Sequence, residues 1–554
     1  MKNAISLIVL TILTANGLFA QTRIDTLVSE KDLLKGGLGP ERTCYDVLHY
    51  RIDIEIDPSK RMIDGKVDIV FKALEDFTVM QIDLYDNMQI HEILHENKPL
   101  IFDRKYDAVF VTLPQIKKGA EPTITIVYSG QPISAKNAPW DGGFVWKTDK
   151  DGNPWVGVAC QGDGASLWWP CKDHLSDEPN TTVIKITVPD TLKAVANGRL
   201  ITDRREGKGK HSFTWAVSYP INSYNININV GNYVHFNDTY TANDGAKLDL
   251  DYYVLPYNLE KAKKHFRQVH DVLGCFEEFF GKYPFWEDGY KLIETSYLGM
   301  EHQSAIAYGN LYRRGYLGDR IPKDMNFDYI ILHESGHEYF GNSVSASDLA
   351  DMWIHESFTT YMEALFVECQ MSYSAAVRYL EYQRPFIRNE EPIIGVRGVN
   401  WHKRVTTSDQ YYKGSWILHT LRSIVDDDDR WKAYLKSLYK EFEMKIITSE
   451  DILEYTQAYF KEIELKHFFS QYLYRPEIPV IHYKLSETQD GIKMQYQMQS
   501  QESDLKIPIK VRVGNQTIKI IAENKLKSLL LETDKCSDVQ ILKNLYLLDF
   551  VLQP

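Results

Sequence analysis

The sequence contains few cysteines and has no excess of positive charge. Its six cysteines are scattered over 554 residues, too sparsely for a disulfide framework and without zinc-finger spacing. Only Cys160 and Cys171 lie near each other in sequence, and this pair could form a disulfide or remain as buried thiols. The formal net charge is −13. An acidic chain argues against non-specific nucleic-acid binding, which requires a basic surface.

Several patterns of common enzyme and membrane proteins are also missing. The sequence has no G-x-S-x-G pattern to suggest a serine hydrolase. The glycines near residue 37 are not followed by Lys-Ser or Lys-Thr, so a phosphate-binding loop is not supported, and we expect residues 21–45 to form an exposed loop. Beyond the N-terminus, no apolar run is long enough to cross a membrane.

The N-terminus carries a pattern that predicts export. Lys2 is followed by the apolar run Ala4–Leu13 and by a plausible cleavage site before Gln21. Polar residues interrupt the run, so a cleaved signal peptide over residues 1–20 is favoured over a membrane anchor. We therefore expect a periplasmic or secreted protein with no stable membrane insertion after cleavage.

The spacing of two histidines predicts a metal site. His333 and His337 lie four residues apart, so on a helix with 3.6 residues per turn both imidazoles share one face. Glu334 follows the first histidine, which completes the H-E-x-x-H pattern of zinc peptidases with the glutamate as general base. Apolar residues flank the pattern and indicate a buried helix, in which histidines need partners.

Zinc in a catalytic site needs a third protein ligand and keeps a fourth position open for water. Eighteen residues separate His337 from Glu356, enough for a turn and a second helix that runs back past the first. The acidic or histidine candidates in this window are Asp348, Asp351, His355 and Glu356. Glu356 lies in a helical pattern that continues through Phe366. We predict one zinc ion bound by His333, His337 and one of these four side chains, of which Glu356 is in the helical pattern.

These residues carry a family resemblance. The stretch from His333 to Glu356 resembles the zinc signature of the aminopeptidase N and leukotriene hydrolase family, and residues 337–342 resemble its H-x-W-F-G-N segment with Tyr in place of Trp. Residues 297–302 are similar to the family's G-x-M-E-N strand, with Leu298 for the first Gly and His302 for the Asn. Residues 158–179 resemble its T-Q-x-E loop followed by W-F-P-C and D-E-P, and residues 411–414 resemble its Y-x-K-G.

The resemblance implies roles for individual residues. Glu334 would be the general base and Tyr411 would stabilise the oxyanion. Gly299 and Met300 would belong to the strand that pairs with the substrate backbone. The α-ammonium of the substrate would be bound by Glu301, the pocket for its first side chain would be lined by Gln161, and Asp163, one methylene shorter than the family's Glu, would help to hold the amine. A carboxylate at a fixed distance from the metal limits cleavage to the first peptide bond.

The expected fold is multidomain α+β. Alternating runs such as Val67–Phe71, Thr123–Tyr128, Val183–Val188 and Ile226–Val230 predict an N-terminal β-saddle or sandwich domain over residues 21–247. Helical patterns, beginning with Leu259–Phe280, predict a mostly helical domain over residues 248–477. The family resemblance implies that this is a thermolysin-like catalytic domain. A second alternating region predicts a small β-sandwich over residues 478–554.

The most direct interpretation is a zinc aminopeptidase whose partners are peptides with a free N-terminus. Three alternatives remain at this point. A zinc endopeptidase would need no amine anchor, an epoxide hydrolase of the same family would need a long apolar channel, and a non-catalytic binding protein would use the site as a recognition pocket. Nothing in the sequence indicates an oligomeric state.

Overall fold

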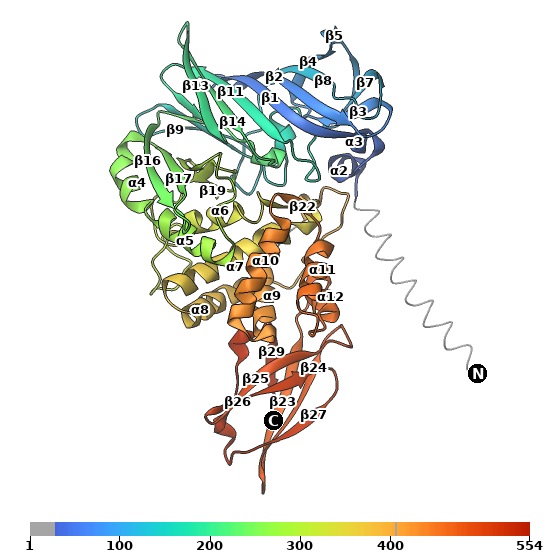
Figure 1. The fold of residues 1–554 in the computed structure, drawn as a ribbon, viewed down its shortest axis with the longest axis vertical. Coiled ribbons are helices and arrows are strands. Elements are labelled where there is room, and N and C mark those ends of the chain that lie inside the picture. The colour runs from blue at the N-terminus through green and yellow to red at the C-terminus, as the bar shows by residue number, and fades with distance from the viewer. Residues whose placement is uncertain (1–27, 405–406) are drawn as a thin grey trace, which may run out of the picture.

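The computed structural model describes residues 28–404 and 407–554, in three parts that follow one another along the chain (Figure 1). A β domain is followed by a helical region, and a small β domain forms the C-terminal end. This is the multidomain α+β architecture expected from the sequence. The predicted signal peptide, residues 1–20, lies outside the described residues.

The N-terminal domain is built around one eight-stranded sheet in the order β13-β14-β11-β1-β2-β8-β4-β5. Its central strand β1 pairs in parallel with β11 and antiparallel with β2, and alternate residues such as Ile52, Ile54 and Ile56 are fully buried. The strands of this sheet are β1 (Tyr45–Asp57), β2 (Met62–Ala73), β4 (Met88–His95), β5 (Lys98–Pro99), β8 (Thr123–Gly130), β11 (Thr181–Pro189), β13 (Arg199–Gly207) and β14 (Lys210–Val217).

Two smaller sheets complete this domain. One has the order β12-β15-β10-β9 and the other β3-β7-β6. Their strands are β3 (Phe77–Asp83), β6 (Ile101–Lys105), β7 (Ala108–Ile116), β9 (Gly143–Thr148), β10 (Pro154–Ala159), β12 (Lys193–Val195) and β15 (Asn229–Gly231). The predicted strand Ile226–Val230 is mostly wrong, because only its last two residues belong to β15 and a 3-10 turn, Ser223–Asn225, precedes it.

The N-terminal lead-in corrects another expectation. Residues 21–45 were expected to form an exposed loop, but the described part contains two short helices, α2 (Glu30–Gly36) and α3 (Pro40–Thr43). Ser29 and Asp32 form a capping box at the start of α2. At the end of α2, a Cβ on Gly36 would lie 2.1 Å from the carbonyl carbon of Val399. The glycine therefore permits close packing of the lead-in against the helical region.

The catalytic region begins with a five-stranded sheet in the order β16-β17-β18-β20-β19. Its strands are β16 (Val234–Thr241), β17 (Lys247–Val254), β18 (Tyr290–Glu294), β19 (Gly299–Met300) and β20 (Ile306–Tyr308). The predicted boundary at residues 247–248 would separate β16 from β17, which pair along their whole length. The sheet topology instead places the transition before Val234.

Helices form the rest of this region. They are α4 (Leu259–His265), α5 (Gln268–Phe279), α6 (Tyr329–His337), α7 (Trp353–Gln370), α8 (Tyr373–Gln383), α9 (Asp409–Val425), α10 (Asp428–Phe442), α11 (Ser449–Tyr459) and α12 (Lys466–Tyr474). The single helix predicted over Leu259–Phe280 is two helices, because Phe266 and Arg267 form a turn between them, in which Phe266 has a ψ of −2°. Within α9, Gly414 lies so close to Ser357 of α7 that a Cβ would be 1.7 Å from its Oγ, so the two helices meet there in near backbone contact.

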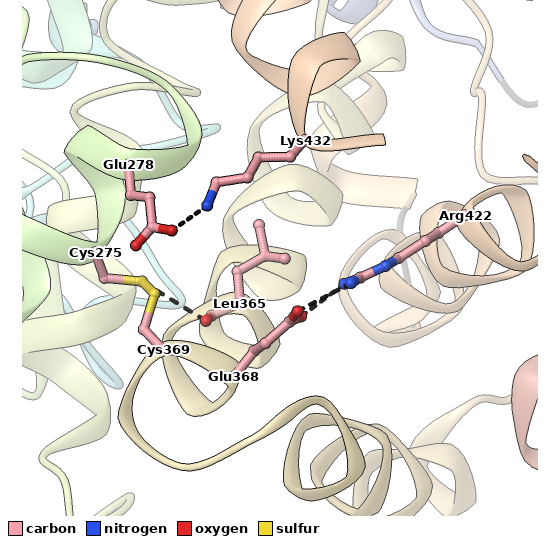
Figure 2. The surroundings of a disulfide bond; sticks show 7 residues. All are labelled: Cys275, Glu278, Leu365, Glu368, Cys369, Arg422 and Lys432. Carbon is pink, nitrogen blue, oxygen red and sulfur yellow. Dashed lines mark hydrogen bonds and ion pairs between the residues drawn. A yellow bond between two sulfur atoms is a disulfide. The ribbon is translucent and has the colours of Figure 1, made fainter. Parts of the chain in front are cut away.

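A disulfide ties α5 to the end of α7 (Figure 2). It joins Cys275 to Cys369, 94 residues apart, with a Cα–Cα distance of 6.1 Å. Cys160 and Cys171 are free and buried. Of the two alternatives for that pair, the disulfide is wrong, and the bond that does form has partners too far apart in sequence to be predicted.

The C-terminal domain contains a four-stranded sheet, β27-β24-β23-β29, and a three-stranded sheet, β26-β25-β28. The alternation at Ile507, Ile509 and Val511 places these side chains in its core. The strands are β23 (Val480–Thr488), β24 (Gly491–Gln499), β25 (Ile507–Val513), β26 (Gln516–Ala522), β27 (Lys527–Leu531), β28 (Val539–Ile541) and β29 (Asp549–Leu552). Across the described part of the chain, no helix combines the length and apolarity needed to span a membrane.

Candidate metal centre and active site

Helix α6 brings the two predicted histidine ligands together. It begins after Asp328, whose carboxylate accepts the backbone N–H groups of Ile330 and Ile331 and so caps the helix. His333 and His337 follow one turn apart, and their Nε2 atoms face each other at 3.2 Å. Both side chains are buried.

The third candidate ligand comes from α7. The Glu356 Oε2 atom lies 3.6 Å from Nε2 of His333 and 3.3 Å from Nε2 of His337. The other three candidates from the same window have different partners. Asp348 accepts the N–H groups of Ala350 and Gly398, Asp351 pairs with Arg397, and the Nε2 atom of His355 accepts the N–H of Ala346.

The donor set fits a zinc ion. Glu356 Oε2 is buried and accepts no well-directed hydrogen bond from any described residue. It points at two imidazole nitrogens that also point at each other, an arrangement that a cation between the three atoms would satisfy. Two nitrogens and one carboxylate oxygen are a donor set of catalytic zinc sites, with one position left open.

The far sides of both imidazoles are held by hydrogen bonds. His333 Nδ1 lies 2.7 Å from Oε1 of Glu363, and His337 Nδ1 lies 3.0 Å from the carbonyl oxygen of Phe340. Both partners are acceptors, so each Nδ1 carries the proton and each Nε2 is left free to bind a metal. Sequence reasoning missed Glu363, although its position seven residues after Glu356, about two helical turns, places it on the same face of α7.

Two further carboxylates lie beside the ligands. Oxygens of Glu301 and Glu334 and a nitrogen of His337 lie within 4.8 Å of one another, and all three residues are buried. Loss of water around Glu334 raises the pKa of its carboxyl to about 7. Glu301 directly follows β19, where a Cβ on Gly299 would come within 2.8 Å of Oε1 of Glu334. The absence of a side chain at Gly299 thus leaves room for the predicted base.

Tyr411 and Gln161 both reach the acidic ligand. The Tyr411 hydroxyl donates to Oε1 of Glu356 at 3.0 Å, and Nε2 of Gln161 donates to the same oxygen at 3.1 Å. Met300 is buried in β19, which pairs antiparallel with β20. Three elements distant in sequence, the loop after β10, β19 and the first turn of α9, therefore converge on the metal helices.

Asp163 lies outside the two buried clusters formed by the ligands, the base and Glu301. Its Oδ2 atom accepts the backbone N–H of Gly142 at 2.8 Å, on the segment that leads into β9. Its role in holding the substrate amine stays a prediction.

Comparison with known families finds a match for the N-terminal β domain and for the helical region. The model of the peptidase family M1 domain matches residues 257–472, and the model of the peptidase M1 N-terminal domain matches residues 47–225. The first match contains His333, His337 and Glu356, and the second contains Gln161.

Curated relatives and solved structures agree with this. The chain is 28% identical to aminopeptidase B of Mus musculus over 313 residues, 54% of this chain and 45% of the mouse protein. It is 22% identical to leukotriene A-4 hydrolase of Xenopus laevis over 455 residues, 76% of this chain and 69% of that protein. The chain thus spans less than half the length of aminopeptidase B.

A crystal structure of an M1 zinc metallopeptidase mutant from Deinococcus radiodurans, bound to a Tyr-Ser-Ala substrate, has a similar fold. The TM-score is 0.65 at 20% identity, and the match covers 80% of this chain and 98% of that chain. At this identity the likeness concerns the fold.

Proposed function

The chain belongs to peptidase family M1, and from this membership we propose that it is a zinc-dependent aminopeptidase, which hydrolyses the N-terminal peptide bond of peptides. The observation that carries the proposal is the position of Glu301, which is buried beside the base Glu334 and the metal ligand His337. One carboxylate oxygen of each glutamate and one ring nitrogen of the histidine lie within 4.8 Å of one another. A carboxylate next to the reaction centre can bind a cationic N-terminus and leave the first peptide bond within reach of the base.

The metal would be held by His333, His337 and Glu356. When bound, zinc acidifies water and polarises a carbonyl group. Glu334 lies beside the ligands with a pKa that burial brings near neutrality, so it can take a proton from the attacking water and return it to the leaving amine. The Tyr411 hydroxyl, now on Oε1 of Glu356, can donate to the oxyanion that develops on the scissile carbonyl.

The dimensions of one amino acid suit this arrangement. The α-nitrogen and the carbonyl carbon of one residue are about 2.5 Å apart, given the standard backbone bonds and angle. An ammonium hydrogen-bonded to Glu301 has its first carbonyl carbon about 2.5 Å from its nitrogen, and an oxygen of Glu334 lies within 4.8 Å of an oxygen of Glu301, so that carbonyl can come within reach of the base. A second peptide bond lies about 3.8 Å further along the chain and does not reach the same position.

The decisive test compares free and blocked amines. We expect the zinc-loaded mature protein to cleave aminoacyl 4-nitroanilides and to leave their N-acetyl counterparts intact. Glu301→Ala should lower kcat/KM on free-amine substrates by about a hundredfold or more, the effect of losing a buried charge pair. Glu260→Ala, which removes an exposed carboxylate on α4, is the control and should have no effect. Cleavage of N-acetyl substrates at comparable rates would instead identify an endopeptidase.

We also propose that the protein acts outside the cytoplasm on peptides with a free N-terminus. The signal pattern over residues 1–20 supports export, and the disulfide between Cys275 and Cys369 is of a kind that persists in oxidising compartments. Mass spectrometry of the protein recovered from its native host should find Gln21 as the first residue. Recovery of an intact Met1 terminus from the cytoplasmic fraction would contradict the proposal.

A further inference from the structure

We propose that Tyr224 is a positioning residue that orients Glu301 for binding of the substrate α-ammonium, and that His355 sets the direction of its hydroxyl hydrogen bond. This inference rests on the proposed aminopeptidase function. Tyr224 comes from the N-terminal β domain, 77 residues before Glu301, and none of the patterns in the sequence singled it out.

The contact is direct and buried. The Tyr224 hydroxyl donates to Oε1 of Glu301 at 3.1 Å, and each residue is 3% exposed. A hydrogen bond from a neutral donor to a buried carboxylate is among the stronger ones in proteins, since little water competes for either atom. It restricts the rotation of the carboxylate and leaves Oε2 of Glu301 as the oxygen available for a cation.

The hydrogen-bond polarity at Tyr224 follows from its other neighbour. The Nε2 atom of His355 lies 2.8 Å from the backbone nitrogen of Ala346. A backbone N–H can only donate, so Nε2 is an acceptor and the proton of the imidazole is on Nδ1. Nδ1 lies 3.5 Å from the Tyr224 hydroxyl oxygen, at the long end of hydrogen-bond distances. With a donor on that side, the tyrosine directs its own hydrogen at Glu301.

The same segment also fixes the backbone of Glu301. Asn222 accepts the N–H of Tyr224 at 3.3 Å, which holds the tyrosine in its 3-10 turn. Asn225 donates to the side-chain oxygen of Asn342 at 2.8 Å, and Asn342 donates to the carbonyl oxygen of Glu301 at 2.9 Å. Side chain and main chain of the amine anchor are thus tied to one turn of the β domain.

Tyr224 matters because Glu301 is the carboxylate that lies beside the base. Oxygens of Glu301 and Glu334 lie within 4.8 Å of each other, and Asp163 is not part of this buried cluster. A single carboxylate binds a cation well only if it is held in the productive orientation. The loss of the tyrosine hydroxyl should therefore weaken the binding of free amines specifically.

The test measures binding as well as turnover. The probes are a reduced-amide dipeptide isostere with a free α-ammonium and its N-acetyl form, titrated calorimetrically into the zinc-loaded protein. For Tyr224→Phe we expect the Kd of the free amine to rise about tenfold, the size of one charge-assisted hydrogen bond, and that of the N-acetyl form to change less than about twofold. In turnover of free-amine substrates, KM should rise by a similar factor with kcat changed less than about twofold.

Two comparisons make the result specific. Tyr472→Phe removes another fully buried hydroxyl, which donates to the Leu547 carbonyl near the C-terminal domain, and should leave both Kd values unchanged. In the Glu301→Ala background, Tyr224→Phe should have no further effect, because it acts through the missing carboxylate.

Three results would overturn the inference. Tyr224→Phe could weaken the binding of the free-amine and N-acetyl probes equally, or could leave the binding of both unchanged. It could also weaken binding by the same factor whether Glu301 is present or replaced by alanine. The ratio of the two Kd values is taken on one sample, so incomplete folding of a variant does not alter it. If the unmodified protein itself fails to distinguish the probes, the proposed aminopeptidase function fails together with this inference. If it distinguishes them and Tyr224→Phe does so equally well, this inference alone fails.

Discussion

Substitution of Glu363 by glutamine should weaken zinc binding even though Glu363 does not face the metal position. Its carboxylate is fully buried and receives three donors. Oε1 lies 2.7 Å from Nδ1 of His333, and Oε2 accepts the Tyr379 hydroxyl at 2.6 Å and Nε2 of Gln383 at 2.8 Å. A glutamine has the same shape but one oxygen, so its amide nitrogen must face at least one of these donors.

The size of the effect can be worked out from this geometry. A buried donor left without an acceptor costs about 1–3 kcal/mol. If the glutamine oxygen stays on Tyr379 and Gln383, its amide nitrogen opposes the proton on Nδ1 of His333 and disfavours the tautomer that binds the metal. Loss of such an outer partner lowers metal affinity about 10- to 100-fold, equivalent to about 1.4–2.7 kcal/mol.

The assay is a competitive titration of bound zinc against a chromophoric chelator, with a thermal melt of the same samples. Glu363→Gln should raise the Kd for zinc about 10- to 100-fold. Glu368→Gln, one and a half turns further along α7, weakens a bidentate pair with Arg422 that lies away from the metal ligands and should leave zinc affinity unchanged (Figure 2). If the zinc Kd of Glu363→Gln stays within about twofold of that of the unmodified protein, the hydrogen bond from Glu363 does not control how His333 binds the metal, and the argument is refuted.

Three other predictions follow from the same structure. Glu334→Gln should keep stoichiometric zinc but lose a factor of about a thousand or more in kcat; retention of wild-type turnover would show that another group is the base. Replacement of Cys275 and Cys369 by serine should lower the free energy of unfolding by about 3–5 kcal/mol in denaturant titrations, since the bond closes a long loop, and an unchanged midpoint would contradict this. Burial raises the pKa of Glu178 from 4.5 to about 7, and one of its oxygens has no partner among the described residues. The stability that its proton provides is fully present below about pH 4.5 and is lost as pH rises through 7, so Glu178→Gln should abolish a fall of roughly 3–4 kcal/mol over that range, and an identical pH profile would argue against it.

Local patterns carried most of what could be predicted from the sequence. The four-residue spacing of His333 and His337 requires only a helix to bring them together, and α6 supplies it. The helical pattern around Glu356 also contains His355, so it is the resemblance to the family's zinc signature that selects Glu356 from the four candidates. The alternation in β1, β2, β8 and β11 likewise predicted strands correctly. Successive side chains of a strand point to opposite faces of the sheet, so apolar residues at every second position mark the buried face.

Contacts between distant segments could not be predicted in this way. The partner of Cys275 is decided by where α5 meets the end of α7, and no local pattern marks a pairing over 94 residues. Asp163 fits a family loop by position, but its shorter side chain reaches the Gly142 amide, which only the folded loop presents. The boundary predicted near residue 247 differs from the structure for a similar reason. The sequence of β16 and β17 has the same strand pattern as the N-terminal β region, but both strands pair into the five-stranded sheet of the catalytic region.

The asparagines at positions 225, 227 and 229 show how an alternating pattern can mislead. They alternate with Ile226, Ile228 and Val230, which in an ordinary sheet would place polar residues in solvent. Here both sets are buried. Asn227 bonds directly to the loop after Glu301, and Asn225 donates to Asn342, which in turn donates to the Glu301 carbonyl. Asn227 donates to the Ala305 carbonyl, so an unsatisfied amide on this face would cost about 1–3 kcal/mol. This polar face is buried against the catalytic region, and its hydrogen bonds therefore join the β domain to the segment that carries Glu301.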